Sequence, residues 1–353
     1  MLLPYKRTKL PLQWSSATKE CTAVMTIFSV LDLSPICEGD SAREAIKNSV
    51  NLARETEKMG YYRYWLAEHH NMKGIASAAT SLVIGHVAEH TTKIRVGSGG
   101  IMLPNHAPMI IAEQFGTLEA LYPGRIDLGL GRAPGTDGLT AQALRRTLNS
   151  DPNNFPKDVL ELKAFLSDPI ENQPVCAVPG YSSKVPIYIL GSSLFGAQLA
   201  AILGFPFAFA SHFAPDALEN ALEVYRSEFQ PSEQLKEPYV MLGFNICAAD
   251  NEEEAKYLKS SGLQALINLR SGKPGPLPPP IRNFEETLCS FEKQLLSQSK
   301  SASATGDLGK IREEVSKFLK HTGADELIIT SQIFDHSSRV KSYEIANEAC
   351  QGL

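Results

Sequence analysis

Three titratable residues, Glu68, His69 and His70, stand side by side at the end of the apolar run WLAEHH (65–70). Such groups can bind a metal ion, transfer protons or cap a strand. Because successive side chains of a strand point to opposite faces, His69 and His70 are poorly placed to bind one metal ion together. The sequence has no HExxH pattern and no carboxylate-rich cluster placed to complete such a site. We therefore expect no metal. A proton-transferring histidine and satisfied structural histidines both stay open.

Glycines inside two apolar runs are a second unusual feature. They interrupt VGSGG (96–100), and in RIDLGLGR (125–132) two of them share one strand face with Asp127. Glycine weakens a strand and often marks a bulge or the close approach of a ligand. Two neighbouring strands with few side chains on one face suggest room for a large flat ligand. Close packing inside the sheet is the alternative.

A possible anion site follows in ILGSSLFG (189–196), where a strand runs through Gly191, Ser192 and Ser193 directly into a helix. The free N–H groups of a first helical turn, together with two hydroxyls, suit a phosphate. Simple N-capping by one serine is the alternative. Arg132 could supply a cationic partner, or it could be an ordinary salt-bridged arginine.

These segments belong to a chain in which strand-like and helical runs alternate. Eight strand-like runs are predicted, at residues 26–35, 61–70, 93–103, 125–135, 185–193, 205–213, 238–250 and 325–334. Parallel strands joined by helices form an open doubly wound sheet or a closed barrel. Eight repeats favour an α/β fold of the (β/α)8 TIM-barrel type, and the lack of GxGxxG after the first strand weakens the open-sheet alternative. In such a barrel, active-site groups lie at the carboxyl ends of the strands.

The domain organisation follows from the segments that do not fit the repeat. Residues 1–25 are polar and lack periodicity, so we expect an N-terminal extension outside the fold, with 26–353 forming the barrel domain. The connections after the fourth strand (136–184) and the seventh strand (271–305) are long enough to be insertions. The second contains GKPGPLPPP, which cannot form a helix or a central strand.

Composition excludes several classes of partner. The 353-residue chain has a formal net charge of -5 and no basic stripe, which argues against nucleic-acid binding. No apolar run approaches the ~20 residues that span a membrane. Six cysteines without a CxxC pattern indicate reduced thiols and a cytoplasmic location.

Taken together, WLAEHH, residues 94–135 and ILGSS resemble the bacterial luciferase-like flavin monooxygenases, most closely the branch called luciferase family oxidoreductase, group 1. The resemblance extends over about residues 26–346 and implies a barrel that binds reduced FMN at its carboxyl end. Glu68 and His69 match the family's Glu-His pair, in which the histidine is catalytic. Gly99 and Gly100 match a pair joined by a non-proline cis peptide beneath the flavin.

The resemblance also assigns the phosphate end of the cofactor. Arg132 matches a phosphate-side arginine, Ser192 and Ser193 match phosphate-binding positions beside Gly191, and Gly196 lies one turn further on. The 271–305 insertion corresponds to the family's mobile lid. The reactive cysteine of the luciferase subunit is replaced by Gly131, so neither light emission nor an aldehyde substrate is expected.

The implied activity is that of a two-component monooxygenase. A separate flavin reductase supplies FMNH2, because the chain has no NAD(P)H fingerprint, and O2 oxidises a small organic substrate. His69 is the expected proton-managing group, oriented by Glu68 or a backbone partner, with His70, His106 and His212 as weaker candidates. A deazaflavin-dependent hydride-transfer enzyme and a non-catalytic FMN-binding protein are the alternatives. The apolar stripes of the early helices leave open whether the chain forms a homodimer.

Overall fold

Eight parallel strands close into a barrel in the computed structural model, which describes residues 26–133, 138–144, 152–299 and 301–353. Strands that follow one another pair in parallel, and β1 also pairs with the last strand, β9. This arrangement confirms the predicted TIM barrel. The barrel strands are β1 (Ile27–Asp32), β2 (Arg63–Leu66), β3 (Arg95–Met102), β4 (Ile126–Gly131), β5 (Ile187–Gly191), β6 (Phe207–Phe209), β7 (Val240–Ala248) and β9 (Glu326–Thr330).

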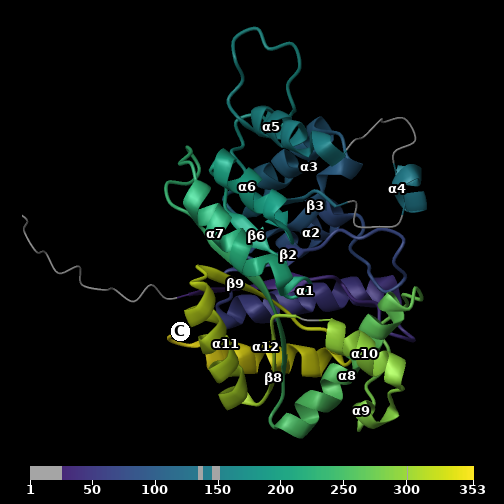
Figure 1. The fold of residues 1–353 in the computed structure, drawn as a ribbon. Helices are drawn as coiled ribbons and strands as arrows, with labels where there is room; N and C mark the ends of the chain where they lie inside the picture. The colour runs from purple at the N-terminus through teal and green to yellow at the C-terminus, as the bar shows by residue number, and fades with distance from the viewer. Residues whose placement is uncertain (1–25, 134–137, 145–151, 300) are drawn as a thin grey trace, which may run out of the picture.

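One main helix follows each barrel strand and packs on the outside of the barrel (Figure 1). These helices are α1 (Ala42–Met59), α2 (Thr80–Glu89), α3 (Pro108–Leu121), α5 (Phe155–Leu166), α6 (Leu194–Leu203), α7 (Leu218–Glu228), α11 (Leu308–Thr322) and α12 (His336–Cys350). Their buried faces pack against one side of the strands in the main hydrophobic core, whereas Leu31, Trp65 and Met241 belong to a smaller apolar cluster inside the barrel. Because successive side chains of a strand point to opposite faces, the barrel strands contribute to both the outer core and the inner cluster.

The ends of α1 show how local sequence sets the element boundaries. The Ser41 hydroxyl accepts a hydrogen bond from the Glu44 N–H, and Gly60, with φ of 91°, ends the helix in the left-handed conformation. The Glu44 carboxylate pairs with Lys47 at 2.8 Å. A serine and a glycine thus set the two ends of this helix.

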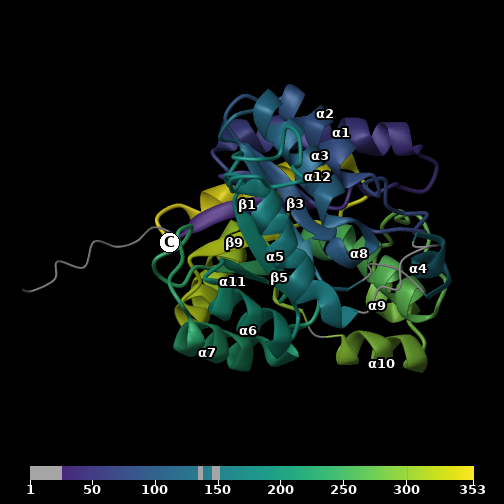
Figure 2. The same ribbon diagram turned by 90° about the horizontal axis from the view of Figure 1, so that it is seen from above.

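The additional elements gather at one end of the barrel. In both views α4 (Gly138–Leu144), α8 (Glu252–Arg270), α9 (Phe284–Thr287) and α10 (Ser290–Gln298) lie on the side away from the chain's C-terminus (Figures 1 and 2). That side is the carboxyl end of the strands, where a TIM barrel carries its active site. The remaining short helices are η1 (Leu103–Asn105), η2 (Pro152–Asn154) and η3 (Pro215–Ala217).

The 271–305 insertion is more structured than its sequence predicts. Its proline-rich part is irregular as expected, but α9, α10 and the strand β8 (Ser303–Gly306) follow. β8 pairs with the second half of β7, beyond the point where β6 ends. A four-residue polar strand has too little pattern to be recognised in advance.

The proline-rich part of this insertion is attached to the loop after β1. The Leu277 N–H donates to the Ile36 carbonyl at 2.8 Å, and the Glu38 N–H donates to the Leu277 carbonyl at 2.9 Å. The segment thus spans the barrel mouth between α8 and β1. Mobility of this lid stays a prediction.

Several expectations concern residues outside the described ranges. They are the N-terminal extension (1–25), the end of the fourth predicted strand (134–135) and the second half of the helix expected at 140–148. Among the described helices, none is both long and apolar enough for a membrane span.

Candidate active site

A cavity of about 840 Å³ opens at the carboxyl ends of the barrel strands, and α8 forms part of its wall. This volume lies within the ~300–1,000 Å³ of typical ligand pockets. Most of the residues predicted from the sequence line it, namely His69, Gly99, Arg132, Gly191, Ser192, Ser193 and Gly196. Glu68 and Gly100 lie behind the wall. Most of the strand-end residues thus lie around one cavity, as expected. The roles of these residues stay predictions.

The glycines of β3 and β4 divide into two groups. Gly99 and Gly131 line the cavity, and the Gly99–Gly100 peptide bond is cis, as the resemblance implies. Gly97 and Gly129 instead allow close packing, since an added Cβ would lie 2.5 Å from the Asp127 carbonyl oxygen or 2.2 Å from the Ser98 carbonyl oxygen. Close packing also applies to Gly99 and Gly131, where an added Cβ would lie 2.7 Å from a side-chain atom of Leu31 or Met102. The approach of a flat ligand to these two glycines stays a prediction.

Asp127 corrects the expectation that its strand face is nearly empty. Its carboxylate is fully buried and forms salt bridges with Arg63 at 2.7 Å and Arg95 at 2.6 Å, while the Trp65 indole N–H donates to it at 3.1 Å. This part of the barrel interior is filled by an ion network. Space for a ligand begins only above it.

Two histidines in the cavity wall are held neutral by burial. His69 and His212 both line the cavity, and neither Nδ1 has a hydrogen-bond partner among the described residues. Burial lowers the pKa of His212 to about 4, and it also lowers the pKa of His69 against the raising effect of Glu68. An imidazole in a cavity wall that has one ring nitrogen without a hydrogen bond is suited to a ligand or to proton transfer.

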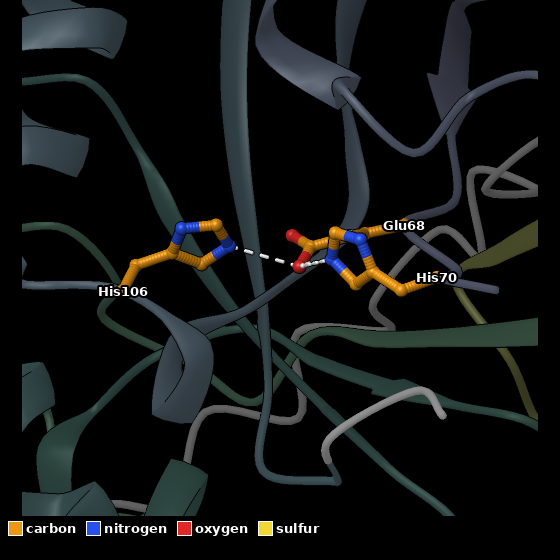
Figure 3. A group of neighbouring side chains, drawn as sticks. All are labelled: Glu68, His70 and His106. Atoms are coloured by element: carbon orange, nitrogen blue, oxygen red, sulfur yellow. Dashed lines mark hydrogen bonds and ion pairs between the residues drawn. The ribbon is translucent and has the colours of Figure 1, made fainter. Parts of the chain in front are cut away.

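Glu68 binds two other histidines and not His69 (Figure 3). Its Oε1 accepts hydrogen bonds from His70 Nε2 at 2.7 Å and from His106 Nε2 at 2.8 Å, and its Oε2 accepts the Met102 N–H at 3.1 Å. Burial opposes its ionisation, but these bonds lower the pKa of Glu68 below its ordinary value. The expectation that Glu68 orients His69 directly is therefore wrong. Glu68 instead connects the loop after β2 to the segment after β3.

The same three side chains form the group that could hold a metal ion. The donor atoms of Glu68, His70 and His106 lie within 4.8 Å of one another. The pairing considered from the sequence, His69 with His70, is not the one brought together, because His69 turns to the cavity and His70 to Glu68. The Nε2 atoms of His70 and His106 both bond to the same oxygen of Glu68. The three side chains therefore satisfy one another by hydrogen bonds without a metal ion. The absence of a metal stays a prediction.

The N-terminus of α6 has the features expected of a phosphate site. Ser193 is the N-cap residue, yet its hydroxyl makes no capping hydrogen bond. This argues against the simple capping alternative. Gly191 and Gly196 lie so close that a Cβ on Gly191 would be 3.3 Å from the Gly196 Cα, so both glycines allow the helix start to approach the end of β5. The first-turn N–H groups are thus presented at the cavity wall.

Arg132 supplies a cation beside this helix end. Its guanidinium lies 4.2 Å from the Phe195 ring centroid, and both side chains line the cavity. Within the described ranges it makes no salt bridge, so the surface salt-bridge alternative is not supported. A stacked guanidinium without a salt bridge to any described residue is well suited to a phosphate.

Sequence inspection missed the contribution of α8. Lys259, Gly262, Leu263, Leu266 and Arg270 all line the cavity, and their spacing places them on one helical face. This stripe was readable from the sequence once the helix was known to cross the barrel mouth. No pattern within the helix reveals that position.

Comparison with known proteins identifies the family. The model of the family described as luciferase-like monooxygenase matches residues 26–271. The chain belongs to this family. It is 55% identical to a luciferase-like monooxygenase of Escherichia coli strain K12 over 326 residues, covering 92% of this chain and 97% of that protein.

Two further relatives are similar along nearly their whole length. An N-acetyl-S-alkylcysteine monooxygenase of Bacillus subtilis strain 168 is 30% identical, covering 92% of this chain and 98% of the relative. The crystal structure described as apo-MsnO8 has a TM-score of 0.82 at 30% identity, covering 92% of this chain and 98% of that chain. This luciferase-like protein is accordingly an oxidoreductase of the monooxygenase class.

Proposed function

We propose that the chain is the oxygenase component of a two-component monooxygenase, which uses FMNH2 and O2 to oxidise a small organic substrate. The observation that carries this proposal is the cavity itself. The N-terminus of α6, the glycines of β3 and β4 and the imidazole of His69 all line this one space. Reduced flavin, when bound, supplies the electrons and the reactivity with O2.

The residues of the chain bind the cofactor at its two ends. Ser192, Ser193 and the first-turn N–H groups of α6 hold the phosphate together with Arg132. Gly99 and Gly131 present a wall with little side-chain bulk against which a flat ring can lie. Among the described residues, the Ser193 hydroxyl makes no capping hydrogen bond and Arg132 makes no salt bridge, and both features fit FMN.

The remaining tasks are to exclude water and manage a proton. α8 and the segment around Leu277 cover the cavity, which limits the access of water to reactive species. His69 is neutral because of its burial, so its free Nδ1 can accept or hold a proton next to the bound ligands. Glu68 acts indirectly by fixing the adjacent loops through His70 and His106.

Rapid mixing of the FMNH2-loaded protein with O2 tests the reaction type. We expect a transient absorbance that belongs to neither reduced nor fully oxidised flavin, with His69→Ala changing its rate of formation or decay roughly 100-fold or more. His86→Ala, on the exposed face of α2, is the matched control and should behave as wild type. The proposal fails if no transient forms and His69→Ala oxidises flavin at the wild-type rate. Tight binding of deazaflavin, or of oxidised FMN without turnover, would favour an alternative.

Comparison of FMN with riboflavin tests the phosphate site. Riboflavin lacks the phosphate, so the wild-type protein should bind FMN more tightly, and Arg132→Met should remove most of that difference. Loss of one charge-assisted contact corresponds to roughly 10- to 100-fold in Kd. Arg43→Met, exposed on α1, is the control. Equal loss of FMN and riboflavin affinity in Arg132→Met would place the arginine outside the phosphate site.

The proposed partners are a separate flavin reductase and a second copy of the chain. The lack of an NAD(P)H fingerprint supports the need for a reductase. Leu82 on α2 and Leu121 on α3 are 75% and 64% exposed, and they offer apolar surface for a homodimer. Light scattering that gives the mass of one 38.6 kDa chain would contradict the dimer. The cytoplasmic location stays a prediction.

A further inference from the structure

The cavity carries more positive charge than one phosphate needs. Among the described residues that line it, three side chains are cationic, Arg132, Lys259 and Arg270, and none is an aspartate or glutamate. Arg132 lies beside the phosphate-type site at α6, but the other two belong to α8. A second negatively charged group is therefore needed to balance this wall.

Lys259 is the less exposed of the two cations on α8. It forms no hydrogen bond or ion pair with any residue in the described parts of the chain, and burial lowers the pKa of its ammonium group. The neighbouring Cys247 does not neutralise it, because burial raises the pKa of that thiol to about 12 and keeps it protonated. The charge of Glu285 raises the pKa of Lys259 through space, but by less than burial lowers it. A charge in this position is costly unless an anion pairs with it.

Uncharged hydrogen-bonding groups and an apolar surface adjoin Lys259. Thr305 of β8 lies opposite Cys247 of β7 in the strand register, and both line the cavity. Further along the same face of α8, Leu263 and Leu266 also line the cavity. This end of the cavity adjoins β7 and β8 and is separated from the α6 phosphate site by β6. The cation, hydroxyl and leucines suit an organic acid with an apolar body.

We propose that the cavity binds, besides the cofactor, a small organic anion whose carboxylate pairs with Lys259 and whose apolar body lies along Leu263 and Leu266. This inference rests on the proposed function and names its substrate class. Arg270 is exposed and lies 5.8 Å from the Phe213 ring centroid, so it attracts anions at the rim.

Calorimetric titration of the FMN-loaded protein with hexanoate and hexanamide tests this site. The two probes have the same apolar chain, but only hexanoate is charged. We expect wild type to bind hexanoate roughly tenfold or more tightly than hexanamide. Lys259→Met should abolish this preference, and Lys259→Arg should retain it. Lys256→Met is the matched control, because Lys256 is exposed one turn earlier and pairs with Glu252.

The outcomes separate this proposal from that of the enzyme's function. Equal affinities in wild type, or an unchanged hexanoate preference in both Lys259→Met and Lys259→Gln, would overturn the anion site. Both variants remove a half-buried charge, and their melting temperatures identify any loss of folding. If the protein fails to bind FMN, the same titration in an Arg132→Met background, where the phosphate-type site is disabled, still measures the Lys259 site. A Lys259-dependent preference there supports the anion site even though the FMN proposal has failed.

Discussion

At the scale of single residues, burial determines how the cavity histidines behave. Burial lowers the pKa of His212 to about 4, with a smaller contribution from the charge that His69 carries when protonated. Burial lowers the pKa of both imidazoles and so favours their neutral forms near pH 7. Neutral imidazole is the form that can take up a proton during catalysis.

The pH dependence of stability follows from the same shift. Because the pKa of His212 is lower in the folded protein than its ordinary value of 6.5, the unfolded chain binds more protons between pH 6.5 and about 4. The free energy of unfolding therefore falls as pH decreases through this window. We expect wild type to lose about 2 kcal/mol more than His212→Gln between pH 7 and pH 5. Urea denaturation at both pH values measures this difference.

An exposed histidine provides the comparison for this prediction. His86→Gln should show the same pH dependence as wild type, because His86 lies on the exposed face of α2. Parallel loss of stability in wild type and His212→Gln would show that His212 titrates alike in the folded and unfolded states.

The sequence predicts the location of a site residue when that residue lies at the end of a strand. His69, Ser193 and Arg132 lie in the carboxyl-terminal parts of predicted strands, so barrel geometry alone brings them to one end. The pairing of Glu68 with His106 could not be predicted, because it spans 38 residues and depends on the path of the segment after β3. Lys259 was missed for a similar reason, since only the fold shows that α8 crosses the mouth.

At the scale of elements, a buried ion network joins strands on different sides of the barrel. Arg63 of β2 binds Asp127 of β4 at 2.7 Å and Glu326 of β9 at 2.8 Å. The Tyr239 hydroxyl donates to the Glu326 carboxylate at 2.6 Å. Charged residues inside predicted strands are the only hint of this network in the sequence, and they do not reveal which strands they connect.

Replacement of Arg63 by methionine tests the importance of this network for folding. Arg63→Met would leave two fully buried carboxylates, Asp127 and Glu326, without their shared cation. We expect a loss of about 3–5 kcal/mol in the free energy of unfolding, measured by urea denaturation. Lys58→Met, which breaks only an exposed pair with Glu55, should cost less than about 1 kcal/mol. If Arg63→Met lowered the free energy of unfolding by as little as Lys58→Met does, Arg95 alone would be sufficient to compensate the carboxylates.

At the scale of the whole molecule, closure of the barrel brings the two ends of the described fold together. The Thr26 N–H donates to the carbonyl of Leu353, the last residue, at 3.0 Å, and β1 pairs with β9. The βα repeats made the barrel predictable. The extra pairing of β8 with β7 was not predictable, because it comes from an insertion rather than from the repeat.

Deletion of residues 1–25 tests where the folding unit begins. Both neighbours of β1 are supplied by later strands, and the family match starts at residue 26. We therefore expect a chain that starts at residue 26 to keep the wild-type melting temperature within about 2 °C, a shift that corresponds to roughly 1–1.5 kcal/mol for a domain of this size. A fall of more than 5 °C in differential scanning calorimetry would contradict this boundary.

The position of Trp65 gives that shortened chain a practical property. The full chain has two tryptophans, Trp14 and Trp65, so the shortened one retains a single indole. Trp65 is buried at 1% exposure and forms part of the cavity wall. A flavin that enters the cavity comes within energy-transfer range of this fluorophore and quenches its emission. The protein thus contains its own optical reporter of cavity occupancy, with no label attached.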